Sequence, residues 1–293
     1  MVKNSLKMCP KINNQQTVEL SRWSHIKIGT QSHNFYLPKD HEQLIEILKN
    51  SQKSNNVPLF LAGGSNILFG NSSSYTIISD ASLPSFWRRE GKNIIVSENY
   101  NITRLLMEMS RLDLGNMEFL AGIPAHIAGL VKMNAGAYGS QISYFVNHIK
   151  VIDFNGEIKK LSGSEINFSY RSTDIAGFIT EICLTPEPKS QLQVLSDIKT
   201  NIDKRRLHQP LNMPNLGSIF KNPQDTSAGY LLDMIGFKGK KNGDAAFSNL
   251  HANIMVNLGK AEFSDALKLI DKAREAVMKD FHIELELEIK VVN

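Results

Sequence analysis

Three side chains in the second half of the sequence stand in settings that suit proton transfer or anion binding. Ser218 lies in the string Gly-Ser-Ile-Phe-Lys-Asn-Pro, Arg171 in Ser-Tyr-Arg-Ser, and Glu288 in Glu-Leu-Glu-Leu-Glu. A serine hydroxyl can donate a proton to a stronger base, and an arginine can grip a carboxylate with two parallel hydrogen bonds. Each of them alone is more often a capped turn or a solvated charge. The alternation around Glu288 puts three glutamates on one strand face, whose default is solvent.

A loop of small residues follows a short apolar run in the first half. The run Leu59–Ala62 predicts a buried strand, and the sequence then continues with Gly63, Gly64, Ser65 and Asn66. Glycine admits positive φ angles, so such a loop can turn its backbone N–H groups toward one point and bind a phosphate. An ordinary strand-to-helix turn explains the two glycines equally well. The sequence contains neither Gly-x-Gly-x-x-Gly nor the P-loop pattern, which disfavours the ordinary dinucleotide and P-loop sites.

Small residues are also crowded between residues 121 and 139. A backbone this bare usually runs flat against something, either another chain segment or a planar ligand. The residues concerned are Gly122, Ala125, Ala128, Gly129, Ala135, Gly136, Ala137 and Gly139.

The sequence contains no motif typical of a metal site or of a serine hydrolase. The eight histidines show no His-x-x-x-His or His-Glu-x-x-His grouping, and Ser218 lacks a Gly-x-Ser-x-Gly elbow. Cys9 and Cys183 match no metal or disulfide spacing, which suits a reducing cytosol. We therefore predict no metal site and a cytoplasmic location.

The composition is that of a globular protein of about two domains. The 293 residues are 42% apolar and 21% charged, which excludes disordered, collagen-like and coiled-coil classes. A net charge of +4 fits an anionic small molecule and is too weak to indicate nucleic acid. No apolar window is long enough to span a membrane, and the polar N-terminus does not resemble a secretory signal.

Several elements that must position these side chains can be predicted. Asp40 caps a helix that runs to about Ser54, and Asn101 caps another. Residues 147–162 predict a hairpin with Asn155-Gly156 as a two-residue turn. Helices are expected over 192–206 and 264–279, and a final strand over 283–292. Pro186 and Pro188 mark the expected boundary between the two halves.

Taken in order, these segments resemble the UDP-N-acetylenolpyruvoylglucosamine reductase (MurB) family, the flavoenzymes of bacterial peptidoglycan synthesis. The resemblance covers roughly residues 20–292. Its most specific strings are Met-Asn-Ala-Gly-Ala-Tyr-Gly at 133–139 and Gly-Ser-x-Phe-Lys-Asn-Pro at 217–223. The segments Ala62–Asn66, Gly122–Pro124 and Ser169–Ser172 support it.

The resemblance implies an α+β fold with an FAD-binding PCMH-type domain of two α+β subdomains. A substrate-binding C-terminal α/β domain of the family's type follows it. The implied boundaries are 20–188 for the FAD domain, with subdomains of about 20–85 and 86–188, and 189–293 for the C-terminal domain. Residues 1–19 are expected to form a flexible tail.

The family's reaction supplies roles for the singled-out residues. NADPH reduces a non-covalently bound FAD, which passes hydride to the enolpyruvyl group of the UDP-sugar, giving UDP-N-acetylmuramate. By the motif match Ser218 is the proton donor, while Arg171 and Glu288 stabilise the intermediate. Arg206, Lys221 and Asn222 match substrate-binding positions. The implied FAD contacts are Gly63, Gly64, Ser65, Asn66, Gly122, Ile123, Pro124, His126, Gly129, Asn134, Gly136, Ala137 and Tyr138.

Two departures from the family pattern leave an alternative open. The segment Pro124–Gly129 carries two alanines in place of glycine and His126 in place of a small hydroxyl residue. Added methyl groups beside a cofactor weaken its binding by about 1–3 kcal/mol if nothing relaxes. The chain could thus be a weakly active or inactive relative that binds FAD or a UDP-sugar. His126 is expected to hydrogen-bond a phosphate or pack, covalent flavin attachment being the minor reading.

The short spacing between Arg171 and Ser218 resembles the family's shorter, type II form. We expect a monomer that acts on small molecules and binds neither nucleic acid nor membrane. A flavin oxidase acting on another alcohol or sugar would share the FAD half but would not explain the Gly-Ser-x-Phe-Lys-Asn-Pro string.

Overall fold

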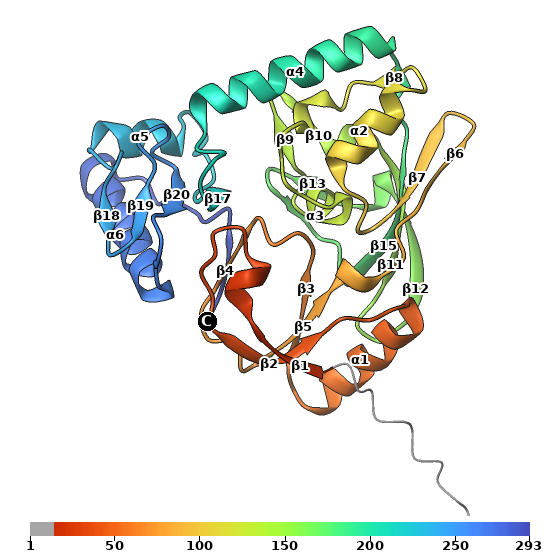
Figure 1. The fold of residues 1–293 in the computed structure, drawn as a ribbon, viewed down its shortest axis with the longest axis horizontal. Helices are drawn as coiled ribbons and strands as arrows, with labels where there is room; N and C mark the ends of the chain where they lie inside the picture. Colours follow the sequence, from red (N-terminus) through yellow and green to blue (C-terminus); the bar gives the residue numbers. More distant parts are fainter. Residues whose placement is uncertain (1–14) are drawn as a thin grey trace, which may run out of the picture.

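The computed structural model describes residues 15–293 and mixes helices with strands (Figure 1). Its buried side chains form clusters that correspond to two α+β units and a C-terminal domain, which confirms the predicted α+β class. Residues 1–14 of the predicted tail lie outside the described residues. Residues 15–19 were wrongly assigned to it, because they form a strand that pairs with the next strand along the chain. None of the described helices combines the length and apolar character needed to cross a membrane.

The first unit is a four-stranded sheet in the order β1-β2-β5-β3, in which β2 and β3 run parallel to β5. The Asp40 side chain accepts a hydrogen bond from the backbone N–H of Gln43 and starts the covering helix, as predicted. Leu44 and Leu48 of that helix pack against Ile78 of the sheet. The elements are β1 (Gln15–Glu19), η1 (Leu20–Trp23), β2 (Gln31–Tyr36), α1 (His41–Lys53), β3 (Val57–Leu61), β4 (Ile67–Phe69), β5 (Tyr75–Ser79) and η2 (Asp80–Ser82).

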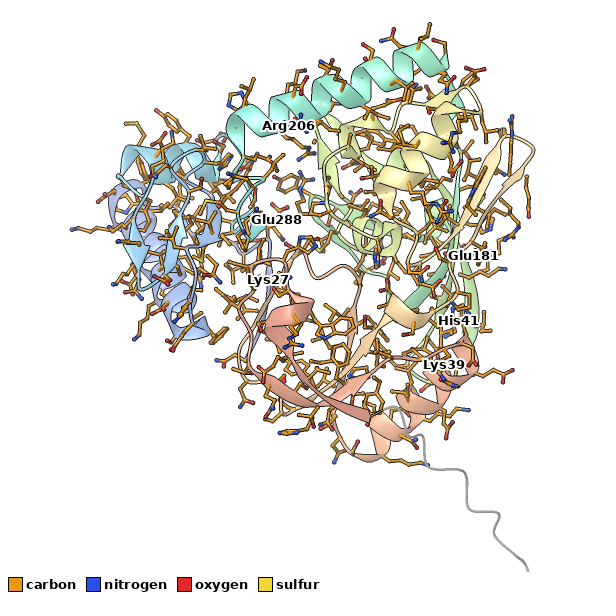
Figure 2. The ribbon with its side chains drawn as sticks, in the orientation of Figure 1. Lys27, Lys39, His41, Glu181, Arg206 and Glu288 are labelled. Carbon is orange, nitrogen blue, oxygen red and sulfur yellow. The ribbon has the colours of Figure 1, made fainter. Side chains whose placement is uncertain are left out.

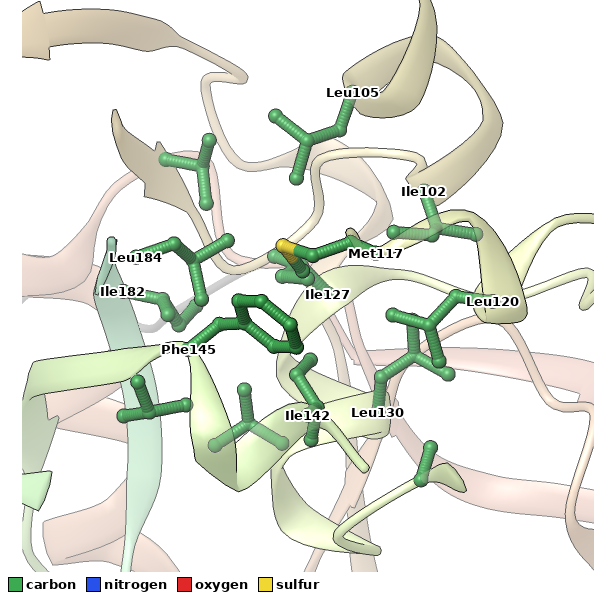
Figure 3. Packing of buried hydrophobic residues seen from close by; sticks show 14 of the residues in the cluster. Ile102, Leu105, Met117, Leu120, Ile127, Leu130, Ile142, Phe145, Ile182 and Leu184 are labelled. Carbon is green, nitrogen blue, oxygen red and sulfur yellow. The ribbon is translucent and has the colours of Figure 1, made fainter. Parts of the chain in front are cut away.

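The second unit is a five-stranded antiparallel sheet in the order β12-β11-β15-β7-β6. Its core is the largest apolar cluster of the molecule, with Phe145 at its centre in Figure 3. The long elements are β6 (Trp87–Glu90), β7 (Asn93–Ser97), α2 (Ile102–Ser110), α3 (Ile127–Lys132), β11 (Val146–Ile152), β12 (Ile158–Ser162) and β15 (Phe178–Leu184). The short ones are β8 (Leu114–Gly115), η3 (Glu118–Leu120), β9 (Gly136–Ala137), β10 (Ser140–Gln141), η4 (Ile142–Tyr144), η5 (Gly163–Glu165), β13 (Phe168–Ser169), β14 (Ser172–Thr173) and β16 (Glu187–Pro188).

The predicted two-residue turn of the 147–162 hairpin is wrong. Ile152 pairs with Ile158, so five residues connect the strands. The Asp153 carboxylate accepts hydrogen bonds from the backbone N–H groups of Asn155 and Glu157, which stabilises the longer loop.

The C-terminal domain is a four-stranded antiparallel sheet in the order β17-β20-β19-β18 with a long helix packed against it. That helix begins with a capping box between Glu262 and Asp265. The elements are α4 (Gln191–His208), β17 (Asn215–Ser218), α5 (Ala228–Met234), β18 (Lys241–Asn242), β19 (Ala245–Phe247), β20 (Ile254–Asn257), α6 (Phe263–Phe281) and β21 (Lys290–Val292).

Two chain segments tie the C-terminal domain to the α+β units (Figure 1). Ile198 and Ile202 of α4 pack on the core of the second unit, and β21 runs parallel to β4 of the first. The prediction of one strand over 283–292 is therefore wrong. The segment leaves the C-terminal domain, where Leu287 makes an isolated bridge to Phe220, and joins a different sheet. The boundary at 188/189 stays a prediction.

Candidate active site between three structural units

A cavity of about 1100 Å³ lies where the two α+β units and the C-terminal domain meet. Small-molecule sites are clefts of this order of size, so it can hold a dinucleotide. Most of the residues predicted from the sequence line it. They are Gly63, Gly64, Ser65, Asn66, Gly122, Ile123, Pro124, His126, Gly129, Gly136, Ala137, Arg171, Ser218 and Glu288.

The loop after β3 forms a cradle for an anion. Gly64 has φ +68°, and the Asn66 carbonyl accepts a hydrogen bond from the backbone N–H of Lys290. Within residues 15–293, no protein acceptor takes the backbone N–H groups of Gly63, Gly64 or Ser65. Unpaired N–H groups on a loop with alternating backbone hand are the donors that phosphate groups use. The cradle therefore fits the diphosphate of FAD.

Replacement of Gly64 by alanine is expected to abolish FAD retention and to destabilise the fold. A Cβ at this position would lie 2.0 Å from the Trp23 carbonyl oxygen, and the positive φ adds strain. Gly63→Ala is the matched control, because its Cβ would make an ordinary 3.5 Å contact with the Pro124 carbonyl oxygen. The flavin absorbance of the purified variants and their thermal unfolding measure both effects. Equal flavin content in the two variants would contradict the cradle.

The second run of small residues forms another wall of the same cavity. A Cβ on Gly129 would meet Ala62 at 3.6 Å, so this run packs beside the cradle. Asn134 and Tyr138 do not line the cavity, unlike their neighbours. Asn134 is fully buried, donates to Gln141 and Ser169, and accepts from the backbone N–H of Ser143. These bonds mean that Asn134 holds the loop around residues 134–143 in place. Tyr138 lies outside the cavity and is 55% exposed.

Arg171 and Glu288 meet across the cavity although 117 positions separate them. The Arg171 Nε donates to Glu288 Oε1 at 3.1 Å, and its Nη2 donates to the Gly136 carbonyl oxygen at 2.6 Å. These bonds hold the guanidinium of a residue with φ +54° against the bare backbone. The structure thus brings into contact two residues that the motif match predicted for one site.

Ser218 approaches the same place at the end of β17. The backbone N–H of Glu288 donates to the carbonyl of Ile219 at 2.8 Å, which sets Ser218 one residue from this contact with the Glu288 segment. Asn66 joins them from the cradle, since its Nδ2 donates to the Glu288 carbonyl at 3.0 Å. Of the three alternating glutamates, only Glu288 departs from the solvent default: its side chain is 20% exposed, against 74% for Glu286.

Burial raises the pKa of the Glu288 carboxyl, and the positive charges of Arg171 and Lys221 act against that shift. The protonated form of Glu288 is therefore more accessible than in water, which allows this side chain to donate as well as accept.

Arg206, Lys221 and Asn222 do not line the cavity. The Arg206 side chain is 69% exposed and pairs with Asp203, which also lies on α4 (Figure 2). Lys221 pairs with Glu286, and the Asn222 side chain accepts from the backbone N–H of Ala228. The predicted substrate-binding role of these three residues therefore has no support from the lining of the cavity, and it stays a prediction.

Arg205, the neighbour of Arg206, lines the cavity instead. It is 8% exposed, and it donates to the carbonyl oxygens of Ala121 and Phe119 at 2.8 and 3.0 Å. No acidic side chain among residues 15–293 pairs with it. The two arginines are adjacent in the sequence, and only the rotation of α4 against the second unit distinguishes them.

Arg205→Met is expected to lower the free energy of unfolding by about 2–4 kcal/mol, because two carbonyl groups lose their donors inside the protein. Arg206→Met should leave it within about 0.5 kcal/mol, since exposed ion pairs contribute little. Urea unfolding of the two variants measures the difference. A destabilisation of equal size in both would contradict this assignment of the buried arginine.

Sequence reasoning also missed an aromatic group and an acid in the cavity wall. Phe60 stacks on Phe154 with ring centroids 6.0 Å apart and makes an edge contact with Phe178 at 5.0 Å. All three line the cavity and suit a planar ring system. Asp80 lines it too, and its carboxylate binds His126 at 2.9 Å. Neither group shows a local sequence signal, because their members come together only in the fold. No group of three or more candidate metal ligands occurs within residues 15–293.

Comparison with known proteins agrees with this architecture. A model of the FAD binding domain matches residues 33–162, and a model of the C-terminal domain of UDP-N-acetylenolpyruvoylglucosamine reductase matches 209–292. The enzyme of that name from Moorella thermoacetica is 34% identical over 93% of this chain and 91% of its own length.

The chain belongs to the UDP-N-acetylenolpyruvoylglucosamine reductase family. The reductase of Aquifex aeolicus is likewise 34% identical, over 94% of each chain. The crystal structure of the reductase from Thermus caldophilus aligns with a TM-score of 0.81 at 27% identity, covering 95% of this chain and 99% of that one. Family membership and the FAD-binding model together assign FAD as the cofactor, to which the cradle and the cavity are fitted.

Proposed function

We propose that this protein reduces the enolpyruvyl group of UDP-N-acetylglucosamine enolpyruvate to the lactyl ether of UDP-N-acetylmuramate, with NADPH as the reductant. The observation that carries the proposal is the meeting of Arg171, Glu288 and Ser218 in the cavity that also contains the glycine cradle. Family membership supports the same reaction.

FAD, when bound, supplies a hydride carrier between the nicotinamide and the substrate. The chain's contribution is to hold and cover it. Gly63, Gly64 and Ser65 present unpaired N–H groups to the diphosphate, and the bare backbone near Gly136 leaves room for a flat ring.

Hydride addition at C3 of the enol ether leaves negative charge at C2, delocalised onto the substrate carboxylate. In the proposal Arg171 binds that carboxylate, because a guanidinium stays charged and can form two parallel hydrogen bonds. Glu288 fixes the Arg171 fork through the 3.1 Å bond, and its raised pKa lets it carry a proton beside the growing charge. Ser218 delivers the proton to C2, which a dry cavity makes feasible for a hydroxyl group.

The short spacing between Arg171 and Ser218 supports the proposal that this protein is of the family's shorter, type II form. We further propose a monomeric, cytoplasmic enzyme with non-covalently bound FAD and small-molecule substrates, and with no nucleic-acid or membrane partner. Light scattering tests the monomer, and release of the flavin on acid precipitation tests the non-covalent linkage.

The experiment that tests the function is NADPH oxidation by the FAD-loaded protein, followed at saturating enolpyruvyl sugar. Oxidation should depend on the sugar and yield UDP-N-acetylmuramate in equal amount. Binding of FAD and the UDP-sugar without sugar-dependent oxidation would overturn the proposal and favour an inactive relative.

A further inference from the structure

Two buried acids of the cavity wall, Asp80 and Glu98, each pair with a histidine, and the proposed reaction does not use them. His126 Nδ1 lies 2.9 Å from Oδ2 and 3.1 Å from Oδ1 of Asp80, 46 positions away. The Asp80 side chain is 3% exposed, whereas His126 keeps 25% of its surface and lines the cavity. Because the carboxylate engages Nδ1, Nε2 is the ring nitrogen that a ligand can reach.

Glu98 extends this wall. Its Oε1 lies 3.1 Å from Nε2 of His41, at the start of α1 (Figure 2), and its Oε2 is buried with no hydrogen-bond partner within the described residues. Burial raises the pKa of Glu98, the bond to His41 opposes this shift, and the charge of Asp80 adds to it. An ionised Asp80 beside a neutral His126 would therefore give this part of the cavity a net negative charge.

The histidine borders the glycine cradle. A Cβ built on Gly63 would lie 3.5 Å from the Pro124 carbonyl oxygen and 3.8 Å from the backbone nitrogen of His126. A diphosphate in the cradle would thus sit next to the Asp80–His126 pair. Negative charge on Asp80 repels such a ligand unless the imidazole carries the compensating proton.

We propose that Asp80 holds His126 as an imidazolium whose Nε2–H donates to a phosphate oxygen of FAD, so that FAD binding weakens as the pH rises. The inference rests on the FAD assignment of the proposed function and deepens it. His126 is the residue that touches the cofactor, and Asp80 is a positioning residue that acts through it.

The electrostatic surroundings of His126 agree with this role. Burial lowers its pKa, but the hydrogen bond and charge of Asp80, with the charge of Glu98, outweigh burial and raise the pKa above its ordinary value. His25 faces it from the first unit with a pKa lowered by burial, by Lys27 and by His126 itself. A raised pKa keeps the imidazolium present on the acid side and removes it as the pH rises through that pKa. FAD affinity should fall in the same window, by up to about tenfold per pH unit.

The experiment titrates FAD into the apoprotein between about pH 6 and about pH 9 and follows flavin fluorescence. The dissociation constant of the wild-type protein should rise across this range. His126→Gln should bind FAD more weakly at the acid end and lose most of the pH dependence. Asp80→Asn should move the rise to lower pH, because an amide does not hold the proton on the ring. His148→Gln, a change outside the cavity, is the matched control and should follow the wild type.

An NMR titration of the His126 ring in the wild-type and Asp80→Asn apoproteins supplies a readout that does not depend on activity. Asp80→Asn should lower the His126 pKa. A wild-type dissociation constant that does not change with pH, or a His126→Gln curve parallel to the wild type, would overturn the inference. Either of these two results would leave the reductase proposal standing. The wild-type measurement does not depend on whether a variant folds. Apoprotein that binds no FAD at any pH would overturn both.

Discussion

Ser218→Ala should stop formation of UDP-N-acetylmuramate while leaving reduction of the flavin by NADPH intact. A positioned general acid contributes about 10²- to 10⁴-fold to a rate, so turnover on the enolpyruvyl sugar should fall by that factor. Ser218 reaches the cavity from β17 of the C-terminal domain, whereas the cradle that holds the cofactor follows β3 of the first unit. Removing one hydroxyl oxygen there leaves the cradle unchanged. Stopped-flow absorbance of the flavin separates the two half-reactions.

The control is Ser248→Ala, a change of the same kind at a buried serine that does not line the cavity. It should keep the sugar-dependent rate within a few-fold. If Ser218→Ala slowed both half-reactions equally, the hydroxyl would serve the cofactor and the proton-donor role would fail.

Arg171→Lys is the second change with a large expected effect. The arginine bonds Glu288 and the Gly136 carbonyl through two different nitrogens, and a lysine presents one compact charge that cannot reproduce this fork. We expect kcat/KM for the enolpyruvyl sugar to fall about 10²- to 10³-fold, the usual cost of losing a preorganised charge donor. FAD content and the NADPH half-reaction should stay near wild type.

Glu288→Gln distinguishes the two partners of this ion pair. The amide oxygen of the glutamine can still accept the hydrogen bond from Arg171, but the side chain can neither ionise nor transfer a proton. The pH profile of steady-state turnover by this variant should therefore lack the limb that titration of Glu288 produces in the wild-type enzyme. Any limb that remains belongs to other groups. An Arg171→Lys enzyme within threefold of the wild type would contradict carboxylate binding by Arg171.

Local chemistry explains why much of this site could be predicted. Asp40 and Asn101 mark helix starts because their side chains accept from N–H groups three residues ahead, a contact that the adjacent sequence alone determines. The turn at Gly64 is equally local, since its φ of +68° is one that residues other than glycine rarely adopt. The order of these strings along the chain was enough to indicate the family.

The remaining features depend on which surfaces pack together, and adjacent residues on a helix differ by about 100° in direction. Arg205 faces the cavity and Arg206 faces solvent only because Ile198 and Ile202 seat α4 on the second unit. Neither the hydrophobic pattern of the helix nor the net charge of the chain predicts which of the two arginines faces the cavity.

The sequence by itself indicated the α+β class, FAD as the cofactor and the three residues proposed for catalysis, because short strings in a fixed order resemble those of the family. Only the tertiary structure decided that Glu288 leaves the solvent face for Arg171, and that Asp80 meets His126. These pairs join residues far apart in the chain, and their energies come from burial and charge in a shared wall that no single segment contains.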